Sequence, residues 1–279
     1  MSELSCILIH IVVYRIKKEV TQMQYKRAEK YEYSSEVGEL NRSNRLLFGV
    51  DSVIPANMLL QNNLELFEWV RRNKNYPAFW GRNILGEGAL TQDEIVYLRE
   101  STCKIAPFCM VVGVMETALQ GLILGAKAVL KAQELGIPEG TAIFVQIDTM
   151  QKVTTAYLQG YASVLLSEGY IPGFKANTDA NYDFDREFSR GLQVDRGTFS
   201  QCLLWATAPI VPEYEGITTT HLFHPDEWKP FAPSGTTRSD IAIWQYGRDC
   251  HPIPDDSNNM PVFNVDLIHD VSGMIKYMY

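Results

Sequence analysis

The sequence has little that would place it among disulfide-bonded or membrane-spanning proteins. Its 279 residues include only five cysteines, none in a Cys-x-x-Cys pair, so we expect buried thiols and no disulfide framework. No apolar run approaches the roughly 20 residues that a membrane helix needs. The short apolar run at residues 6–14 follows an acidic residue and precedes basic ones, the reverse of a secretory signal. The sequence therefore predicts no membrane span and no export signal.

Positive charge and cofactor motifs are also scarce. Lys and Arg total 25 against 33 Asp and Glu, which gives a formal net charge of -8. This balance argues against nucleic acid or an anionic membrane as the main partner, and leaves carbohydrates, neutral small molecules and basic peptides open. The histidines show no His-Glu-x-x-His or His-x-His spacing, and no predicted strand leads into a phosphate-binding or nucleophile-elbow motif. We therefore predict neither a metal site nor a cofactor.

The clearest structural signal is the run at residues 141–148, which ends in Asp148. Ile143, Val145 and Ile147 alternate with Phe144, so both faces of this strand are apolar, as in a parallel sheet covered on both sides. A helix over residues 121–135 precedes it and closes at Gly136. An ionisable side chain at the C-terminal end of such a strand is typical of the catalytic end of an α/β barrel.

Strands and helices alternate along the rest of the chain from residue 46. The expected strands are 46–51, 76–83, 104–112, 141–148, 170–177, 202–207, 241–246 and 262–266. The expected helices are 63–72, 91–100, 115–135, 151–168 and 185–192. Thr91 and Glu94 predict a capping box at the start of the second helix. Gly121 and Gly125 allow the third helix to pack closely on a neighbour. This order predicts an α/β fold, a TIM-like (β/α) barrel.

Residues 1–45 stand apart from the barrel pattern. Residues 23–44 are dense in charge and poor in aliphatic side chains, which indicates a helical or partly disordered arm. We expect two parts, the arm at 1–45 and the barrel domain at 46–279. Because few side chains of the arm could join a core, we expect it to be dispensable for folding.

Three aspartates share one position in this pattern. Asp51, Asp148 and Asp266 each end a short apolar strand, so a parallel barrel would bring them to the same rim. Carboxyl groups around one cleft can cleave a glycosidic bond when one is protonated and another ionised. The alternative is that each aspartate only caps a helix or fixes a turn. Three together favour the catalytic interpretation.

Aromatic side chains and an arginine accompany these aspartates. Trp80, Trp205, Trp244 and Tyr246 lie in or at the ends of predicted strands, where rings at a cleft mouth would bind the faces of sugars. Each ring alone is equally consistent with the core. Arg82 would bind a carboxylate or pair with a rim aspartate, and a structural salt bridge is the alternative.

Several motifs occur together and in order: residues 48–51 (FGVD), 79–82 (FWGR), 135–138 (LGIP) and 244–246 (WQY). In these the chain resembles a bacterial family, the glycoside-hydrolase-like domain of envelope proteins, which is related to the family 25 muramidases, or Chalaropsis-type lysozymes. The resemblance covers about residues 46–268. It implies a TIM-like barrel, often irregular in its later strands, with a cleft at the strand C-termini. It also implies a peptidoglycan-type carbohydrate ligand and a location in the cell envelope or outside the cell.

The resemblance also implies site residues. Asp51 and Asp266 match the first-strand and last-strand aspartates of the muramidases. The fourth strand departs from their Asp-x-Glu motif. In one register Asp148 replaces the acid and Gln146 its partner, whereas in the other the acid is replaced by Met150. Strand alternation puts Gln146 and Asp148 on one face, which favours the first register.

Two functions follow from these residues. The first is a glycoside hydrolase acting on peptidoglycan or a related bacterial polysaccharide, with Asp148 as general acid and Asp51 or Asp266 as base or electrostatic stabiliser. Apolar strand residues and a neighbouring carboxylate would keep Asp148 protonated. The second is a barrel that binds cell-wall glycan without cleaving it. The separation of the carboxyl groups should discriminate between the two.

Overall fold

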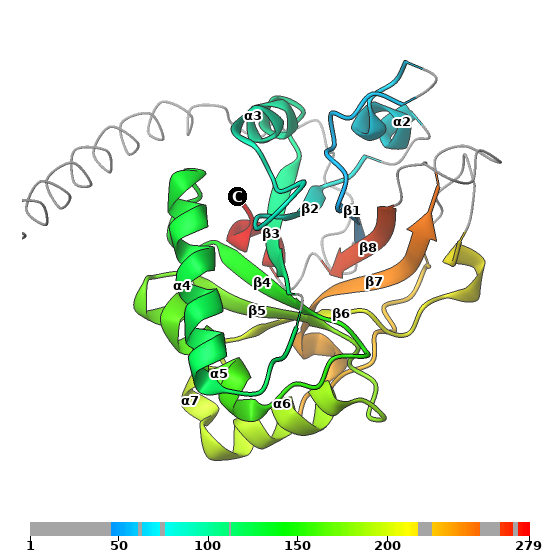
Figure 1. Cartoon of the computed structure of the whole chain (residues 1–279). Coiled ribbons are helices and arrows are strands. Elements are labelled where there is room, and N and C mark those ends of the chain that lie inside the picture. Colours follow the sequence, from blue (N-terminus) through cyan, green and yellow to red (C-terminus); the bar gives the residue numbers. More distant parts are fainter. Residues whose placement is uncertain are drawn as a thin grey trace, which may run out of the picture. The chain divides into compact units, whose positions relative to one another are not determined.

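A computed structural model gives the fold of the chain (Figure 1). It describes residues 46–60, 63–72, 76–111, 113–216, 225–251, 263–269 and 273–279. The arm predicted for residues 1–45 lies outside these ranges.

Eight strands form one closed barrel, with neighbours paired in sequence order from β1 to β8. The strands are β1 (Leu46–Ser52), β2 (Phe79–Asn83), β3 (Lys104–Met110), β4 (Ala142–Ile147), β5 (Ile171–Ala176), β6 (Leu203–Ala206), β7 (Ile241–Cys250) and β8 (Phe263–His269). Strands β1 to β7 run parallel, whereas β8 is antiparallel to both β7 and β1. The predicted TIM-like barrel is confirmed, with the irregularity in its last strands.

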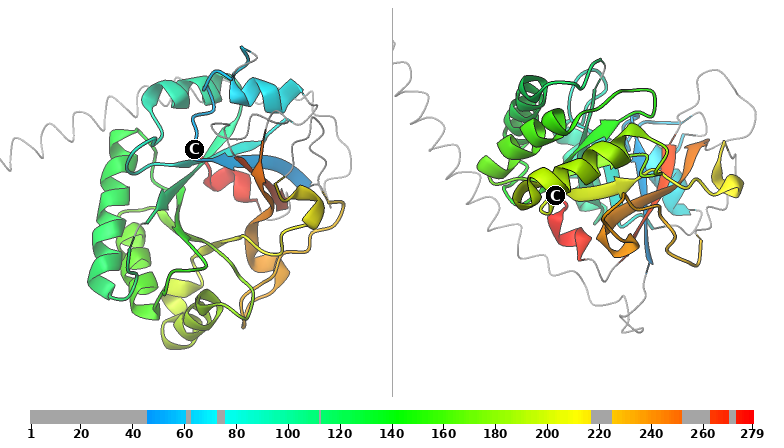
Figure 2. Two further views of the ribbon diagram at one scale, coloured as in Figure 1. Left: turned by 45° about the vertical axis from the view of Figure 1, so that its right-hand side comes forward. Right: turned by 90° about the horizontal axis from the view of Figure 1, so that it is seen from below.

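Helices cover the outside of the parallel part of the barrel (Figures 1 and 2). They are α2 (Leu66–Arg72), α3 (Gln92–Glu100), α4 (Ala118–Glu134), α5 (Thr155–Ser167), α6 (Asp183–Val194) and α7 (Arg196–Phe199). Within the described ranges, the connection from β6 to β7 contains only 3-10 turns, at Pro212–Tyr214 and Arg238–Asp240. In its described part, this connection therefore packs on the barrel as loop and 3-10 turns, without an α-helix.

Helices α4 and α5 pack in close contact through glycines. A Cβ on Gly121 would lie 2.1 Å from the carbonyl oxygen of Tyr157, and one on Gly160 would lie 2.3 Å from that of Ala118. The close approach expected for this helix is confirmed.

An aromatic cluster fills the middle of the barrel. The Trp205 ring is met edge-on by Phe79, Phe108 and Phe144, with centroid distances of 6.2, 6.1 and 5.3 Å. Met274 and Met278, from the C-terminal segment, pack on the same buried cluster. The interior of the barrel is therefore a packed core, and the polar side chains inside it lie next to aromatic rings.

Candidate active site

Two of the three predicted aspartates come together inside the barrel. Asp51 is in β1 and Asp266 is in β8, in register with Asn264 and Gly49 respectively. Both are buried, at 2% and 0% exposed. Because β8 runs antiparallel, Asp266 reaches Asp51 from the middle of its strand and does not end a parallel strand as the sequence suggested. Asp266 lies about two residues deeper along β1 than Asp51.

A lysine from the opposite side of the barrel completes the site. Lys175 of β5, 2% exposed, donates from Nζ to Asp51 Oδ1 at 2.5 Å. Its ammonium group also lies 4.4 Å from the Trp205 ring centroid and 4.8 Å from that of Phe108. The ammonium group is therefore held between a carboxylate and two aromatic faces.

Further donors fix the two carboxyl groups. Asn264 donates its side-chain N–H to Asp51 Oδ1 at 3.1 Å, and Trp205 donates Nε1–H to Asp266 Oδ1 at 2.8 Å. Within the described residues, the Oδ2 atoms of Asp51 and Asp266 have no hydrogen-bond donor. These two oxygens are therefore the ones available to share a proton.

The electrostatics favour one proton on this pair. Burial raises the pKa of Asp266 well above its usual range, and the negative charge of Asp51 raises it further. Lys175 and the Trp205 N–H oppose that rise in pKa without cancelling it. Two adjacent carboxyl groups that cannot both ionise behave as a pair holding one proton. The geometry thus places a carboxyl group with a raised pKa beside the carboxylate that Lys175 binds.

A glycine makes room for this arrangement. A Cβ on Gly81 would lie 2.6 Å from both Asp51 Cβ and Trp205 Cη2. Gly81 therefore faces the barrel interior, and strand alternation sends its neighbours Trp80 and Arg82 to the outer face.

Asp148 does not join the pair. Strand β4 ends at Ile147, and Asp148 is exposed in the turn that follows. Its Oδ1 accepts from the Met150 N–H at 3.2 Å and the Thr149 hydroxyl at 3.3 Å. Gln146 lies on the interior face of β4, half-buried, in register with Lys175. The fourth strand thus contributes an amide inside the barrel and a carboxylate at its rim.

The remaining predicted rings lie on the outer face of the barrel. Trp80, Trp244 and Tyr246 are at most 1% exposed. Trp80 packs on Phe67, at 5.6 Å between ring centroids, and Trp244 donates Nε1–H to the carbonyl of Pro209 at 3.0 Å. None of these rings presents a face to a ligand in this structure. Trp205, in contrast, points inward and contacts Lys175 and Asp266.

Arg82 is also on the outer face and fully buried. Its Nε donates to Glu94 Oε1 at 2.7 Å, and the same oxygen accepts the Ala56 N–H at 2.7 Å. The expected capping box is therefore wrong in one half. Thr91 does accept the Glu94 N–H at 3.2 Å, but the Glu94 carboxylate turns inward to the arginine. An ion pair with a buried guanidinium outweighs a cap that water could replace.

Sequence reasoning missed Lys175 and Asn264. The lysine could have been found from the sequence, because Lys175 lies on the same strand face as Gly173 and Ile171 and is flanked by the apolar residues Phe174 and Ala176. A charged side chain at such a position requires a partner inside the barrel.

The described ranges contain neither a metal-ligating cluster nor a membrane-spanning helix. There, no three His, Cys, Asp or Glu side chains gather in a way that could hold a metal ion. No helix in the same ranges has the length and apolarity to cross a membrane.

Comparison with known proteins gives a family and a fold. A family model described as Rv2525c-like, glycoside hydrolase-like domain, matches residues 82–260. No curated protein matches the chain. A crystal structure of an uncharacterised protein from B. stearothermophilus is 26% identical, with a TM-score of 0.69, and covers 84% of this chain and 100% of its own.

Two more distant structures share only 10% identity. One is the modular autolysin LytC from Streptococcus pneumoniae with a synthetic peptidoglycan ligand, at a TM-score of 0.46, covering 80% of this chain and 46% of LytC. The other is a family GH25 lysozyme from Aspergillus fumigatus, at a TM-score of 0.43, covering 83% of this chain and 99% of the lysozyme.

Proposed function

The chain belongs to the Rv2525c-like, glycoside hydrolase-like domain family, and from this premise we propose that it hydrolyses glycosidic bonds in a bacterial polysaccharide of the peptidoglycan type. The observation that carries this proposal is the buried pair of Asp51 and Asp266. Glycoside hydrolysis by carboxylates needs one protonated and one ionised group, and different surroundings are what keep two carboxyl groups in different states.

The roles follow from where each group lies. The pair of Asp51 and Asp266 supplies the proton, with Asp51 on the side toward the carboxyl ends of the parallel strands. Asp148, exposed where β4 ends, acts as base or stabiliser from the rim. Gln146 donates or accepts hydrogen bonds to sugar hydroxyls between them. This exchanges the acid and base roles expected from the sequence, because the protonated group is the buried one.

The proton path is short in this arrangement. The proton shared by the Asp51 and Asp266 carboxyls passes to the leaving glycosidic oxygen through Asp51 while the C–O bond breaks. Lys175 and Asn264 then stabilise the Asp51 carboxylate that is left. A water molecule attacks the anomeric carbon while Asp148 accepts one of its protons. Asp148 then releases that proton to solvent and the pair of Asp51 and Asp266 takes one up from solvent, which returns the site to its starting state.

A second function is favoured by one observation, the burial of the pair. Asp51 and Asp266 are 2% and 0% exposed, and such a pair can stabilise the barrel without contacting a glycan. On this alternative the domain binds cell-wall glycan and does not cleave it.

The test is reducing-end release from purified peptidoglycan, comparing the parent protein with Asp51→Asn, Asp266→Asn and Asp148→Asn. General acid–base catalysis contributes about 10²–10⁴-fold, so each variant should lose turnover by roughly that factor. Activity of the parent should fall as pH rises, because the pair must hold its proton.

The matched control is Asp93→Asn, the same chemical change at an exposed position in the first turn of α3. It should leave turnover unchanged, and circular dichroism should show that all four variants are folded. A parent protein that sediments with peptidoglycan and releases no reducing ends would favour the binding function.

A further inference from the structure

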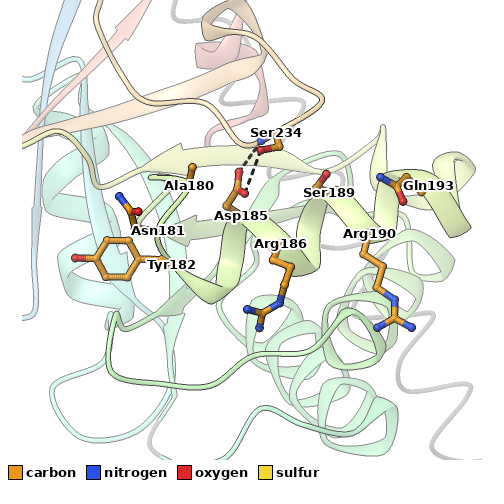
Figure 3. A pocket seen from close by; sticks show the side chains of 9 residues that line it. All are labelled: Ala180, Asn181, Tyr182, Asp185, Arg186, Ser189, Arg190, Gln193 and Ser234. Atoms are coloured by element: carbon orange, nitrogen blue, oxygen red, sulfur yellow. Dashed lines mark hydrogen bonds between the residues drawn. The ribbon is translucent and has the colours of Figure 1, made fainter.

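An open groove of about 610 Å³ runs along α6, outside the barrel (Figure 3). This volume is within the range of small-ligand sites. Its lining is almost entirely polar and comes from three segments: the loop after β5, the exposed side of α6, and Ser234 from the connection between β6 and β7. The lining residues are Ala180, Asn181, Tyr182, Asp185, Arg186, Ser189, Arg190, Gln193 and Ser234.

The groove begins close to the site in the chain. Strand β5 carries Lys175, and the loop that leaves this strand reaches Asn181 and Tyr182 within seven residues. Thr178 in the same loop donates its hydroxyl to the carbonyl of Phe231 at 2.8 Å, which ties the loop to the segment that carries Ser234. A ligand lying along α6 therefore extends from the carboxyl end of β5, the end at which Lys175 lies.

Some charged side chains of the groove have hydrogen-bond or ion-pair partners among the described residues, and one does not. The Asp185 carboxylate is occupied by Ser234, whose N–H and hydroxyl donate to it at 2.6 and 3.1 Å (Figure 3). Arg186 already contacts Asp183 at 2.9 Å and Glu187 at 3.1 Å. Arg190, one turn further along α6 and exposed, forms no ion pair with any residue in the described ranges. Figure 3 shows both guanidinium groups extending from the same side of the helix.

The unpaired charge of the lining selects the class of ligand. Asp183 and Glu187 neutralise Arg186, so Arg190 supplies the positive charge, among the amides of Asn181 and Gln193, the Ser189 hydroxyl and the Tyr182 ring. This composition suits a ligand with many hydroxyls and an isolated carboxylate more than a polyphosphate, which would need several cations. The guanidinium fork binds a carboxylate, the amides and hydroxyl bind sugar hydroxyls, and the aromatic ring covers a sugar face.

We propose that this groove is a binding subsite for an anionic glycan, in which Arg190 binds a carboxylate borne by a sugar. This inference rests on the proposed function, because it adds a chemical class to the polysaccharide that the barrel would process. The probes are chitotetraose, which is neutral, and a tetrasaccharide of alternating N-acetylglucosamine and N-acetylmuramic acid, whose lactyl groups add carboxylates to the same backbone.

Calorimetry on the full chain should show that the parent binds the anionic tetrasaccharide about tenfold more tightly than chitotetraose, the effect of one charge-assisted contact at an exposed site. Arg190→Gln should abolish this preference and leave affinity for chitotetraose unchanged, whereas Arg190→Lys should retain part of it. The preference should also weaken as salt is added. The control is Arg196→Gln, an exposed arginine on α7 outside the groove, which should bind as the parent does.

The outcomes separate the groove from the hydrolase. Equal affinity of the parent for the two oligosaccharides, or an unchanged preference in Arg190→Gln, would overturn the groove proposal even if peptidoglycan is cleaved. A preference that is lost in Arg190→Gln would support the groove even if no reducing ends are released, and only the hydrolase would then be in error.

Discussion

Lys175 is the residue on which the buried charges depend. It places an ammonium group 2.5 Å from Asp51 where no water competes, and the pair is at most 3% exposed. Removing one partner of a buried ion pair leaves an uncompensated charge and costs about 3–5 kcal/mol. We predict that Lys175→Met, which keeps the length and apolar stem, lowers the free energy of unfolding at neutral pH by about this amount in urea titrations.

The control for this prediction is Lys127→Met on the exposed face of α4, which should change stability by less than about 0.5 kcal/mol. If both variants were equally stable, the lysine would contribute no more than a surface charge, and the Asp51 carboxylate would need another source of stabilisation.

For single residues, the sequence predicts strand membership but not whether a side chain faces the interior or the outside of the barrel. Trp80 and Arg82 flank Gly81, and only the contacts of Gly81 with Asp51 and Trp205 show that the glycine faces inward. Alternation fixes the relative faces of neighbours, whereas the choice between inside and outside depends on packing across the barrel. The family motif placed Asp51 and Asp266 in the first and last strands, although Asp266 lies in the middle of β8 and does not end it. Asp148 lies apart from them because β4 ends at Ile147.

Among the elements, the helices α4 and α5 leave little room for larger side chains where they meet. Gly121 lies against backbone atoms of α5, with a virtual Cβ 2.1 Å from Tyr157 O and 2.8 Å from Tyr161 N. We predict that Gly121→Ala destabilises the protein by about 1–3 kcal/mol. The new methyl group would clash with backbone atoms of α5, which cannot move aside as a side chain could, and this cost exceeds the gain of about 1 kcal/mol in helix propensity. Thermal and urea unfolding measure the change.

The matched control is Gly197→Ala on α7, where the added Cβ would meet only Asp195 Oδ1 at 3.6 Å. It should be neutral or slightly stabilising. A neutral Gly121→Ala would mean that the two helices separate readily and that their close contact is not required.

Most helices and strands could be predicted from the sequence, whereas the direction of the last strand could not. All eight strands and the principal helices follow from periodicity, glycine stops and threonine caps, which are local signals. The reversal of β8 is not local. A right-handed crossover helix would make the last strand parallel, and the pattern of residues 262–266 is the same for either direction. The family resemblance, which implied irregular later strands, was the better guide there.

For the whole molecule, long-range and local electrostatics act in opposite directions. The formal net charge of -8 repels an anionic glycan at distance, so recognition depends on a few guanidinium groups at contact range. In the interior, local contacts likewise decide the charge of each buried group. Lys175 forms an ion pair with one of the two buried carboxyl groups, and burial raises the pKa of the other.

Stability as a function of pH should reveal that proton. An aspartate in the unfolded chain titrates near about pH 3.9, whereas burial and the charge of Asp51 raise the pKa of Asp266 well above this in the folded state. Above about pH 4 the folded state therefore binds one more proton than the unfolded state. The free energy of unfolding then falls with rising pH, by about 1.4 kcal/mol per pH unit from this group, until the folded-state pKa is reached.

Asp266→Asn removes this titration and keeps the shape of the side chain. We predict that the difference in unfolding free energy, variant minus parent, rises by about 1.4 kcal/mol per pH unit from about pH 4 toward neutrality. Titrating groups that do not interact with Asp266 are common to both proteins and cancel in this difference. Asp93→Asn, at an exposed position, should give a difference that does not vary with pH in the same window. A flat difference for Asp266→Asn would mean that Asp266 is ionised in the folded barrel, and the pair would then lack the proton that the proposed hydrolysis requires.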